Sequence, residues 1–449
     1  MSKEFSYWTR NNLIDSIDGD IFDVLVIGGG IVGAGIIKGL SELGIKAMLT
    51  DKGDFASGTS SGSSKLIHGG LRYLQQGRLG YSRTLLKERN YLIKNSSVVQ
   101  KIWFNLLVDK YSWKKWEIRT GLFLYSLLGG EITIPKFYKN KGEYHNSITG
   151  YFKFYDGQTD DSRLVLYNVI DAYNNGAYCF NYLSVIAITI KGQIAELTLK
   201  DELRGKVIKV SAKVVINAAG PWSERVIKMA GYELNGKFRL SKGIHIIYDR
   251  NALPITDGVI LGSHLDNRQV LIIPWKNVLV IGTTDRFVDD PDDTSVKQED
   301  INYLIENVAR VFPDIKRAKM LASYSGIRPL FGEGSSPTKI SRDFSLTENG
   351  PIISVLGGKI SDYRRVSKRV IGMICARLSL KINLKDVPKV NFASAMSKRT
   401  YEYMIRFECA IKPEDILRRR EGTEIYDPES LEAKRKEVLA AFKKLNVNT

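Results

Sequence analysis

The chain has 449 residues, 43% of them hydrophobic and 26% charged, which suits two or three globular domains and argues against a disordered or fibrous chain. Lys and Arg number 66 against 49 Asp and Glu, giving a formal charge of +17. Such a field favours anionic substrates, nucleic acid or an acidic membrane surface, and does not choose among them.

Residues 22–51 are predicted to form a βαβ unit. Phe22–Ile27 is a short apolar run typical of a buried parallel strand. A glycine-rich turn and an amphipathic helix follow, and the helix ends at Gly44. The next strand, "KAMLTD", closes with Asp51.

Each glycine of this unit has a physical task. Gly28 permits a tight turn, Gly30 lets a pyrophosphate approach the backbone, and Gly33 lets the helix pack closely on the strand. The helix N-terminus at Ile31 offers N–H groups and a positive dipole to phosphates. Asp51 is placed to accept hydrogen bonds from ribose hydroxyls. The order of these elements predicts a dinucleotide site rather than a purely structural turn.

Residues 60–77, "SSGSSKLIHGGLRYLQQG", are harder to interpret from residue types alone. The stretch is too polar and glycine-broken for a core helix, and its leucines are too regular for a free linker. Either a connection or a ligand-binding segment fits it.

Two later segments look like further pieces of the nucleotide domain, and a block of different character lies between them. Residues 213–223 and 351–378 read as a strand running into small residues and as a strand, glycine turn and long helix. Between them, residues 240–283 contain short strand-like runs with a hairpin turn at "PWKN" (274–277), which predicts an antiparallel block. The chain beyond residue 386 is helical and charged.

Cysteine usage and the apolar runs narrow the compartment. Cys179, Cys375 and Cys409 are far apart and form no CxxC pair, which argues against disulfides or structural zinc and fits a reducing cytosol. The first twenty residues have no secretory apolar core. The longest apolar runs, such as "GLFLYSLL" (121–128), are far shorter than the roughly 20 residues of a membrane helix, so we expect any membrane contact to be peripheral.

The basic residues are spread along the chain, with "DILRRREG" (415–422) as the one tight run. No zinc-finger spacing and no aromatic–basic RNA signature accompanies it. We interpret the diffuse charge as mainly solvated surface, and expect no nucleic-acid partner and no metal site.

Several motifs together resemble one enzyme family. "DVLVIGGGIVGAG", "SSGSSKLIHGGLRYLQQG", "NAAGPWS", "KGIHII", "IGTTD", "YSGIRPL", "SRDFSL" and "GGKISDYRRVSKRV" occur in the order found in FAD-dependent glycerol-3-phosphate dehydrogenases. These are the aerobic, quinone-reducing type within the D-amino-acid-oxidase-like flavoproteins. The resemblance covers roughly residues 22–385, and "SSKLIHGGLRYL" and "GIRPL" are its most specific parts.

The resemblance implies an α/β fold. We expect a Rossmann-like FAD-binding domain of the glutathione-reductase type, interleaved with an antiparallel-sheet substrate domain and followed by a short helical region. The expected limits are 1–80, 158–237 and 341–388 for the FAD-binding domain, 81–157 and 238–340 for the substrate domain, and 389–449 for the helical region.

FAD is the implied cofactor. A helix N-terminus after Gly357–Gly358 would stabilise the anionic reduced flavin, although a plain strand–helix turn also explains the glycines. The implied cofactor-binding residues are Gly28, Gly30, Ile31, Gly33, Asp51, Lys52, Thr59, Ser60, Ser61, Ser64, Lys65, His68, Gly69, Gly70, Ala219, Gly220, Gly357, Gly358, Lys359 and Ile360.

The implied substrate site is cationic. Arg72, Arg342 and Lys359 match residues near the substrate phosphate, and Tyr73 adds a hydroxyl. Arginine suits a phosphate because its planar fork donates two charge-assisted hydrogen bonds. Ordinary ion pairs are the alternative interpretation of Arg72 and Arg342. Where the family usually has "GGKLTTYR", this chain has "GGKISDYR". Asp362 therefore puts an acid at a helix start, where it can cap the helix or disturb the local potential.

Two residues are expected to act on the reacting alcohol. Arg328 matches the arginine beside the hydroxyl, where a fixed cation stabilises a developing alkoxide. His245 matches the proposed general base, since a pKa near 6.5 lets imidazole accept a proton at neutral pH. A core histidine is the alternative for His245, and His68 is the rival base, more readily assigned to holding the cofactor.

The implied reaction is hydride transfer from sn-glycerol 3-phosphate to FAD N5, giving dihydroxyacetone phosphate, with electrons passed to a quinone in glycerol catabolism. An FAD-dependent 2-hydroxy-acid or amine oxidoreductase is one alternative, and a basic protein that retains flavin structurally is another. We expect a cytoplasmic chain on the inner membrane face, held by anionic lipid or by an anchoring or electron-accepting partner. A homodimer is also open.

Overall fold

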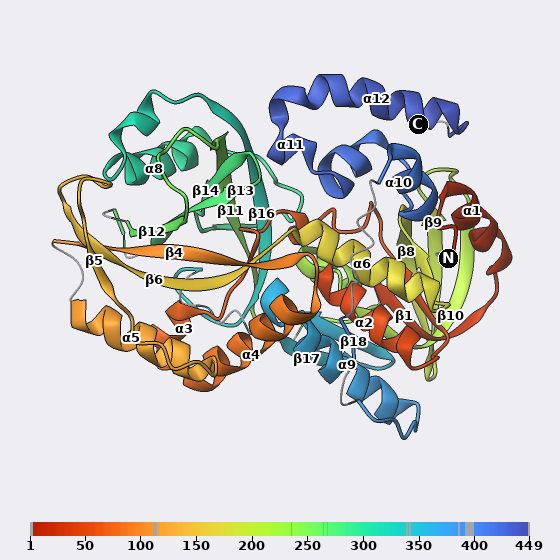
Figure 1. Cartoon of the computed structure of the whole chain (residues 1–449). Coiled ribbons are helices and arrows are strands. Elements are labelled where there is room, and N and C mark those ends of the chain that lie inside the picture. Colours follow the sequence, from red (N-terminus) through yellow and green to blue (C-terminus); the bar gives the residue numbers. More distant parts are fainter. Residues whose placement is uncertain are drawn as a thin grey trace.

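The computed structural model describes residues 3–110, 115–234, 236–263, 265–266, 268–337, 340, 343–384, 387–390 and 399–447. Its strands form two sheets that lie side by side, and a helical C-terminal region lies above them (Figure 1). Each sheet takes strands from several separate stretches of sequence, so the chain crosses between the two sheets repeatedly.

The first sheet has eight strands in the order β17-β18-β10-β1-β2-β7, with β9 also paired to β10 and β8 to β9. Its centre is parallel, because β1 pairs parallel with β10 and β2, and β10 pairs parallel with β18. The strands predicted at the start of the chain and in the two later segments are all present. Their bounds are β1 (Ile21–Ile27), β2 (Ala47–Thr50), β7 (Tyr178–Phe180), β8 (Leu183–Lys191), β9 (Ile194–Asp201), β10 (Val207–Asn217), β17 (Ser345–Asn349) and β18 (Ile352–Leu356).

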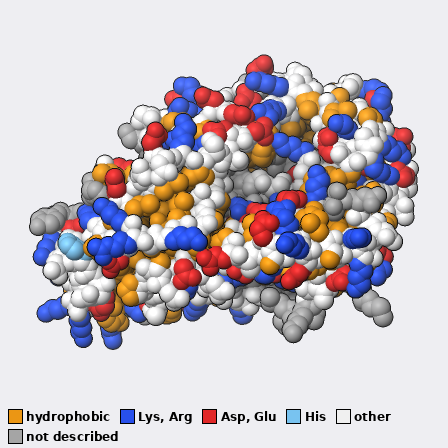
Figure 2. Space-filling view, turned by 90° about the horizontal axis from the view of Figure 1, so that it is seen from above, with side chains coloured by type: hydrophobic (Ala, Val, Ile, Leu, Met, Phe, Trp, Pro, Cys, Tyr) orange, Lys and Arg blue, Asp and Glu red, His pale blue; other side chains and the backbone are white. Residues whose placement is uncertain are grey.

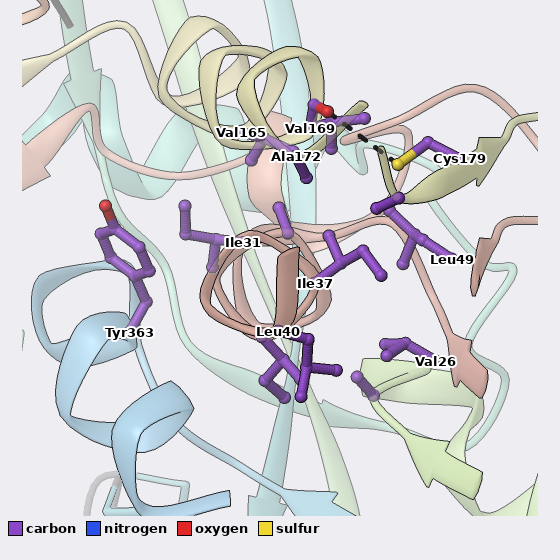
Figure 3. Close-up of a cluster of buried hydrophobic side chains, with 14 of the residues drawn as sticks. Val26, Ile31, Ile37, Leu40, Leu49, Val165, Val169, Ala172, Cys179 and Tyr363 are labelled. Carbon is purple, nitrogen blue, oxygen red and sulfur yellow. Dashed lines mark hydrogen bonds between the residues drawn. The ribbon is translucent and has the colours of Figure 1, made fainter. Parts of the chain in front are cut away.

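Helix α2 (Ile31–Glu42) lies at the centre of a buried core. It packs with α6 (Asp161–Asn174) and α9 (Tyr363–Arg377), and its Ile31, Ile37 and Leu40 are buried with side chains from both neighbours (Figure 3). Gly35 and Gly39 allow the close approach of α9, since a Cβ on Gly35 would overlap Ser367 and one on Gly39 would overlap Ile371. The glycines that break the usual helix composition therefore serve packing.

The second sheet has ten strands in the order β15-β11-β14-β13-β12-β4-β6-β3, with β16 on β11 and β5 on β6. The antiparallel block predicted over 240–283 is confirmed: β13 and β14 form a hairpin turning at Lys276–Asn277. The bounds are β3 (Leu66–Ile67), β4 (Val99–Asp109), β5 (Phe137–Lys139), β6 (Ile148–Thr159), β11 (Phe238–Asp249), β12 (Gly258–Gly262), β13 (Gln269–Trp275), β14 (Val278–Gly282), β15 (Arg286–Val288) and β16 (Met320–Phe331).

Strand β3 pairs with β6, so the segment predicted within the FAD-binding domain contributes to the second sheet. The expected domain limits stay a prediction. Helices α3, α4 and α5 lie on the side of the second sheet opposite the C-terminal region (Figure 1). The other helix bounds are α1 (Tyr7–Ser16), α3 (Leu71–Gln75), α4 (Leu79–Asn95), α5 (Lys115–Leu128), α7 (Ser223–Met229) and α8 (Gln298–Ala309).

Among the helices of the described residues, none combines the length and the apolar character needed to cross a membrane.

The C-terminal region is helical, as expected. It contains α10 (Tyr401–Phe407), a π-helical turn (Asp415–Arg420), α11 (Thr423–Tyr426) and α12 (Leu431–Lys444). On the face seen in Figure 2, acidic and basic side chains are interspersed around a recess near the middle. The arginines of the π-helical turn, however, are not all exposed to solvent, because the Arg420 side chain is buried.

Buried ion pairs fasten this region to the loop after β2 of the first sheet. Arg420 is fully buried and binds the Asp54 carboxylate, and the Arg419 Nε lies 2.5 Å from the same carboxylate. Asp54 follows β2 by four residues. Burial raises the pKa of the Asp54 carboxyl, but Arg420 and Arg419 outweigh this effect and hold that pKa below its usual value.

We predict that Arg420→Ala destabilises the protein by about 3–5 kcal/mol, because it leaves the Asp54 carboxylate buried with part of its charge compensation removed. The decrease in thermal midpoint measures this. The control is Arg406→Ala, since Arg406 is about half exposed and lies 3.6 Å from Glu4, an exposed pair worth about 0–1 kcal/mol. Equal midpoints for the two variants would contradict the prediction.

Candidate active site

A cavity of about 450 Å³ lies where the two sheets meet. Its lining includes the turn after β1, the segment 57–68, the turn after β10, Arg328 of β16 and the turn after β18. The volume is within the usual range for small-molecule and cofactor sites. Both sheets therefore contribute to one site.

Most of the sequence-predicted residues line this cavity. They are Gly28, Gly30, Ile31, Asp51, Lys52, Thr59, Ser60, Ser64, His68, Ala219, Gly220, Arg328, Gly357, Gly358, Lys359 and Ile360. The described residues that do not line it are Gly33, Ser61, Lys65, Gly69, Gly70, Arg72, Tyr73 and His245. Arg342 lies outside the described residues.

The turn after β1 is shaped by its glycines. Gly28 has a φ of +109°. A Cβ there would overlap the carbonyl group of Ala218, which follows the neighbouring strand β10. A Cβ on Gly33 would overlap the Gly28 carbonyl oxygen, so α2 approaches the turn as closely as a backbone permits. The Ile31 N–H at the start of α2 donates to Ser60 Oγ at 2.9 Å.

Asp51 is held at the end of β2 by two backbone groups. Its carboxylate accepts hydrogen bonds from the Gly29 N–H at 2.7 Å and the Gly53 N–H at 2.8 Å. Burial raises the pKa of this carboxyl to about 6, although the two N–H groups act in the opposite direction. The acid thus lines the cavity with its carboxylate already oriented.

Lys65 and Gly69 hold the serine-rich segment in place from behind. The Lys65 ammonium is buried 2.5 Å from the Asp161 carboxylate and 3.0 Å from the Ser61 carbonyl oxygen. The Gly69 N–H donates to Asp156, which also accepts from the Tyr125 hydroxyl at 2.7 Å. Lys65 and Gly69 do not line the cavity themselves, and their contacts support Ser64 and His68, which do.

His245 reaches the cavity through Ser64. Its Nε2 lies 2.9 Å from Ser64 Oγ, its ring stacks on Tyr324, and it is fully buried. A Cβ on Gly282 of the neighbouring strand would overlap the imidazole, so glycine makes room for the ring. Burial lowers the pKa of His245 well below its usual value, and the Arg328 cation lowers it further.

Arg328 is oriented by the connection between β14 and β15. Its Nη1 lies 3.2 Å from Asp285 Oδ1 and its Nη2 donates to Thr283 Oγ1 at 2.9 Å. Asp285 also accepts from the Ser241 hydroxyl. The guanidinium is one-fifth exposed and lines the cavity, which places a fixed cation at its wall.

Lys359 and Tyr73 are 286 positions apart in the sequence and lie in contact in the structure. The Lys359 ammonium donates to the Tyr73 hydroxyl and lies 3.7 Å from the centre of its ring. Asp362 accepts from the Lys359 N–H at 3.2 Å and pairs with Arg365 at 2.7 Å, so this acid acts as a cap with its charge compensated. Arg72 is half-buried on the same helix turn as Tyr73.

Sequence reasoning missed one side of the cavity. Trp222 and Arg225 line it, and both bind Asp292, as does Lys52. Thr283 also lines it, and its place within "IGTTD" was the available signal. Asp292 comes from the loop between β15 and α8 and had no motif to mark it.

Comparisons with known proteins identify the family. A family model described as FAD dependent oxidoreductase matches residues 23–350. The aerobic glycerol-3-phosphate dehydrogenase of Staphylococcus haemolyticus is 33% identical over 415 residues, covering 87% of this chain and 72% of that protein. The chain belongs to the FAD-dependent oxidoreductases, in the branch of the aerobic glycerol-3-phosphate dehydrogenases. The relative of the same name from Staphylococcus epidermidis is 33% identical over 395 residues, covering 84% of this chain and 71% of that protein.

Solved structures agree on the fold. The glycerol-3-phosphate dehydrogenase from Bacillus halodurans, complexed with FAD, has a TM-score of 0.79 at 23% identity and covers 99% of this chain and 94% of its own. The L-alpha-glycerophosphate oxidase from Mycoplasma pneumoniae, with FAD bound, has a TM-score of 0.65 at 17% identity, covering 83% and 98%. This FAD-dependent family fold accounts for the two sheets.

The residues present fit FAD. The turn after β1 has no room for a side chain at Gly28 or Gly33, so its backbone is bare and a pyrophosphate can approach it closely. The N-terminus of α2 lies beside this turn. Asp51 presents the oriented acid that a ribose requires. We propose that the lining residues named above hold the dinucleotide along this path.

We predict that FAD binds more tightly as the pH rises from 5 to 7. Ribose hydroxyls donate best to an ionised carboxylate, and Asp51, with a pKa of about 6 in the FAD-free protein, becomes ionised across this range. Asp51→Asn should weaken FAD binding roughly 10- to 100-fold, the usual effect of losing a charged hydrogen bond, and should flatten this dependence. Fluorescence titration of the FAD-free protein measures both, and an unchanged pH profile in the variant would refute the assignment.

Proposed function

We propose that this chain oxidises sn-glycerol 3-phosphate to dihydroxyacetone phosphate with FAD, and passes the electrons to a quinone during glycerol catabolism. The observation that carries the proposal is family membership together with a cationic cavity wall. Arg328 and Lys359 both line the cavity, and Tyr73 is bonded to Lys359. A phosphate ester carries about −1.5 to −2 charge and calls for more than one cation.

Under this proposal, the chain's own residues bind and deprotonate the alcohol. Lys359, Tyr73 and Arg72 hold the phosphate, together with Arg342 from outside the described residues. Arg328 orients the alcohol oxygen and stabilises negative charge on it. His245 accepts the hydroxyl proton at Nε2 through Ser64 Oγ, which requires the tautomer with its proton on Nδ1. Bound FAD supplies the acceptor for the hydride that leaves carbon 2.

The electron acceptor, the membrane contact and any homodimer are parts of the same proposal. A quinone dissolved in the membrane requires the protein to reach the membrane surface, directly or through an electron-accepting partner. A peripheral position on the cytoplasmic face suits the charge of +17, because that leaflet carries anionic lipids.

Anaerobic flavin bleaching tests the substrate. We expect the FAD-loaded protein to lose its flavin absorbance within seconds of adding sn-glycerol 3-phosphate, and to respond far more slowly to 2-hydroxyglutarate or glycine. Bleaching by one of those two instead would assign the chain to the 2-hydroxy-acid or amine oxidoreductases. A bound flavin that none of the three reduces would support a flavin-retaining binding protein.

The pH dependence of that bleaching tests His245. Because its pKa is lowered, His245 stays neutral and able to accept a proton as the pH falls through 6.5. The acid limb of the bleaching rate should therefore lie below pH 6.5. His245→Asn should slow bleaching about 10²- to 10⁴-fold while FAD remains bound.

Two further variants separate the histidine's role from a packing effect. Gly282→Ala displaces the imidazole without removing it and should also slow bleaching, whereas Gly80→Ala meets no neighbouring atom and should not. His68→Asn tests the rival base. If that variant alone stopped proton transfer, His245 would be a core histidine.

A further inference from the structure

Exposed apolar side chains gather on one part of the molecule. Of the fifteen large hydrophobic side chains that are exposed among the described residues, six lie between residues 116 and 138. We define the α5 patch as Trp116, Phe123, Leu127, Ile132 and Ile134, which are 65%, 37%, 47%, 83% and 63% exposed. Soluble proteins seldom expose such a group without a partner.

These side chains form one surface. Trp116, Phe123 and Leu127 are spaced seven and four residues apart on α5, which places them on one helix face. The segment after α5 is tied to its end, because Ser126 Oγ donates to the Glu131 carbonyl oxygen at 2.8 Å and accepts from the Thr133 N–H at 3.2 Å. Ile132 and Ile134 therefore lie near Leu127.

The inner face of α5 is firmly anchored. Ile118, Leu122 and Tyr125 are buried in the core of the second sheet, and the Tyr125 hydroxyl is bonded to Asp156. The outer apolar face is thus presented by a packed helix, about 21 Å long, on the outside of the molecule (Figure 1).

Exposed basic residues lie next to the patch residues in the sequence. Arg119, Lys136 and Lys139 are exposed, and none of them forms an ion pair with the residues that the structure describes. Lys115 lies 4.2 Å from the Phe137 ring centre, which brings the start of α5 next to β5. Residues 115–139 hold four basic and two acidic side chains.

We infer that the α5 patch is the surface by which this protein docks on an anionic lipid bilayer, with α5 lying in the interfacial plane. Apolar and aromatic side chains bordered by lysine and arginine are what the headgroup boundary of such a bilayer binds. A second copy of the chain fits less well, because a twofold contact would bring the cations of both copies into one interface. The inference deepens the proposed function, since it gives the quinone-reducing enzyme its route to the membrane.

Vesicle co-sedimentation tests the inference with the FAD-loaded protein. We expect binding to vesicles of phosphatidylcholine with about one-third phosphatidylglycerol, and little binding to phosphatidylcholine alone. Ile132→Ser with Ile134→Ser should reduce partitioning at least tenfold. Lys136→Glu with Lys139→Glu should reduce it by about fivefold or more for each charge, and raised salt should mimic this change.

The control is Ile186→Ser with Ile194→Ser, which removes two exposed isoleucines from the β8–β9 hairpin instead. This variant should sediment like the unaltered protein. Equal binding by the patch variants, or no binding of the unaltered protein to anionic vesicles, would overturn the inference. A dimer that the patch variants convert to monomers would overturn it in favour of self-association.

Bleaching by sn-glycerol 3-phosphate without vesicles keeps the two proposals separate. The patch variants should bleach as fast as the unaltered protein, which also shows that they are folded and hold FAD. Loss of vesicle binding with intact bleaching supports the inference. Vesicle binding without any bleaching would leave the docking surface standing and contradict the proposed reaction.

Discussion

The close contact between the turn after β1 and the first residues of α2 is the constraint on which the site depends. Gly33 touches the Gly28 carbonyl group so closely that no side chain fits between them. This contact sets the helix N-terminus against the strand ends, and Gly35 and Gly39 then let α9 pack on the same helix. Because α9 follows β18 and the Gly357–Gly358 turn, its packing on α2 brings that turn to the cavity.

The serine-rich segment connects the cofactor side of the cavity with the second sheet. Ser60 caps α2, Ser64 meets His245 of β11, and β3 pairs with β6. Lys65 and Asp161 form a buried ion pair behind it, which costs desolvation energy but holds a glycine-broken stretch in one conformation. The segment thus joins the glycine turns of the first sheet to His245 and Arg328, which both belong to the second sheet.

Buried charge also joins the C-terminal region to the loop after β2. Arg419 and Arg420 bind Asp54, three residues beyond Asp51. The same region leaves α5 uncovered on the far side of the molecule (Figure 1). The basic residues of this chain thus serve different ends: some neutralise buried carboxylates, some face the cavity, and some lie around the α5 patch.

The sequence by itself determined the βαβ unit and the antiparallel block, because strand periodicity, glycine spacing and a terminal acid are local signals, and the family resemblance pointed to further residues that line the cavity. Only the tertiary structure decided that Lys65 pairs with Asp161, that Arg419 and Arg420 are buried, and that His245 meets the cavity through Ser64. These facts depend on contacts between residues roughly 100 to 370 positions apart, for which one sequence carries no periodic signal. Burial, rather than residue type, decides whether a cation is a ligand, a structural partner or a surface charge.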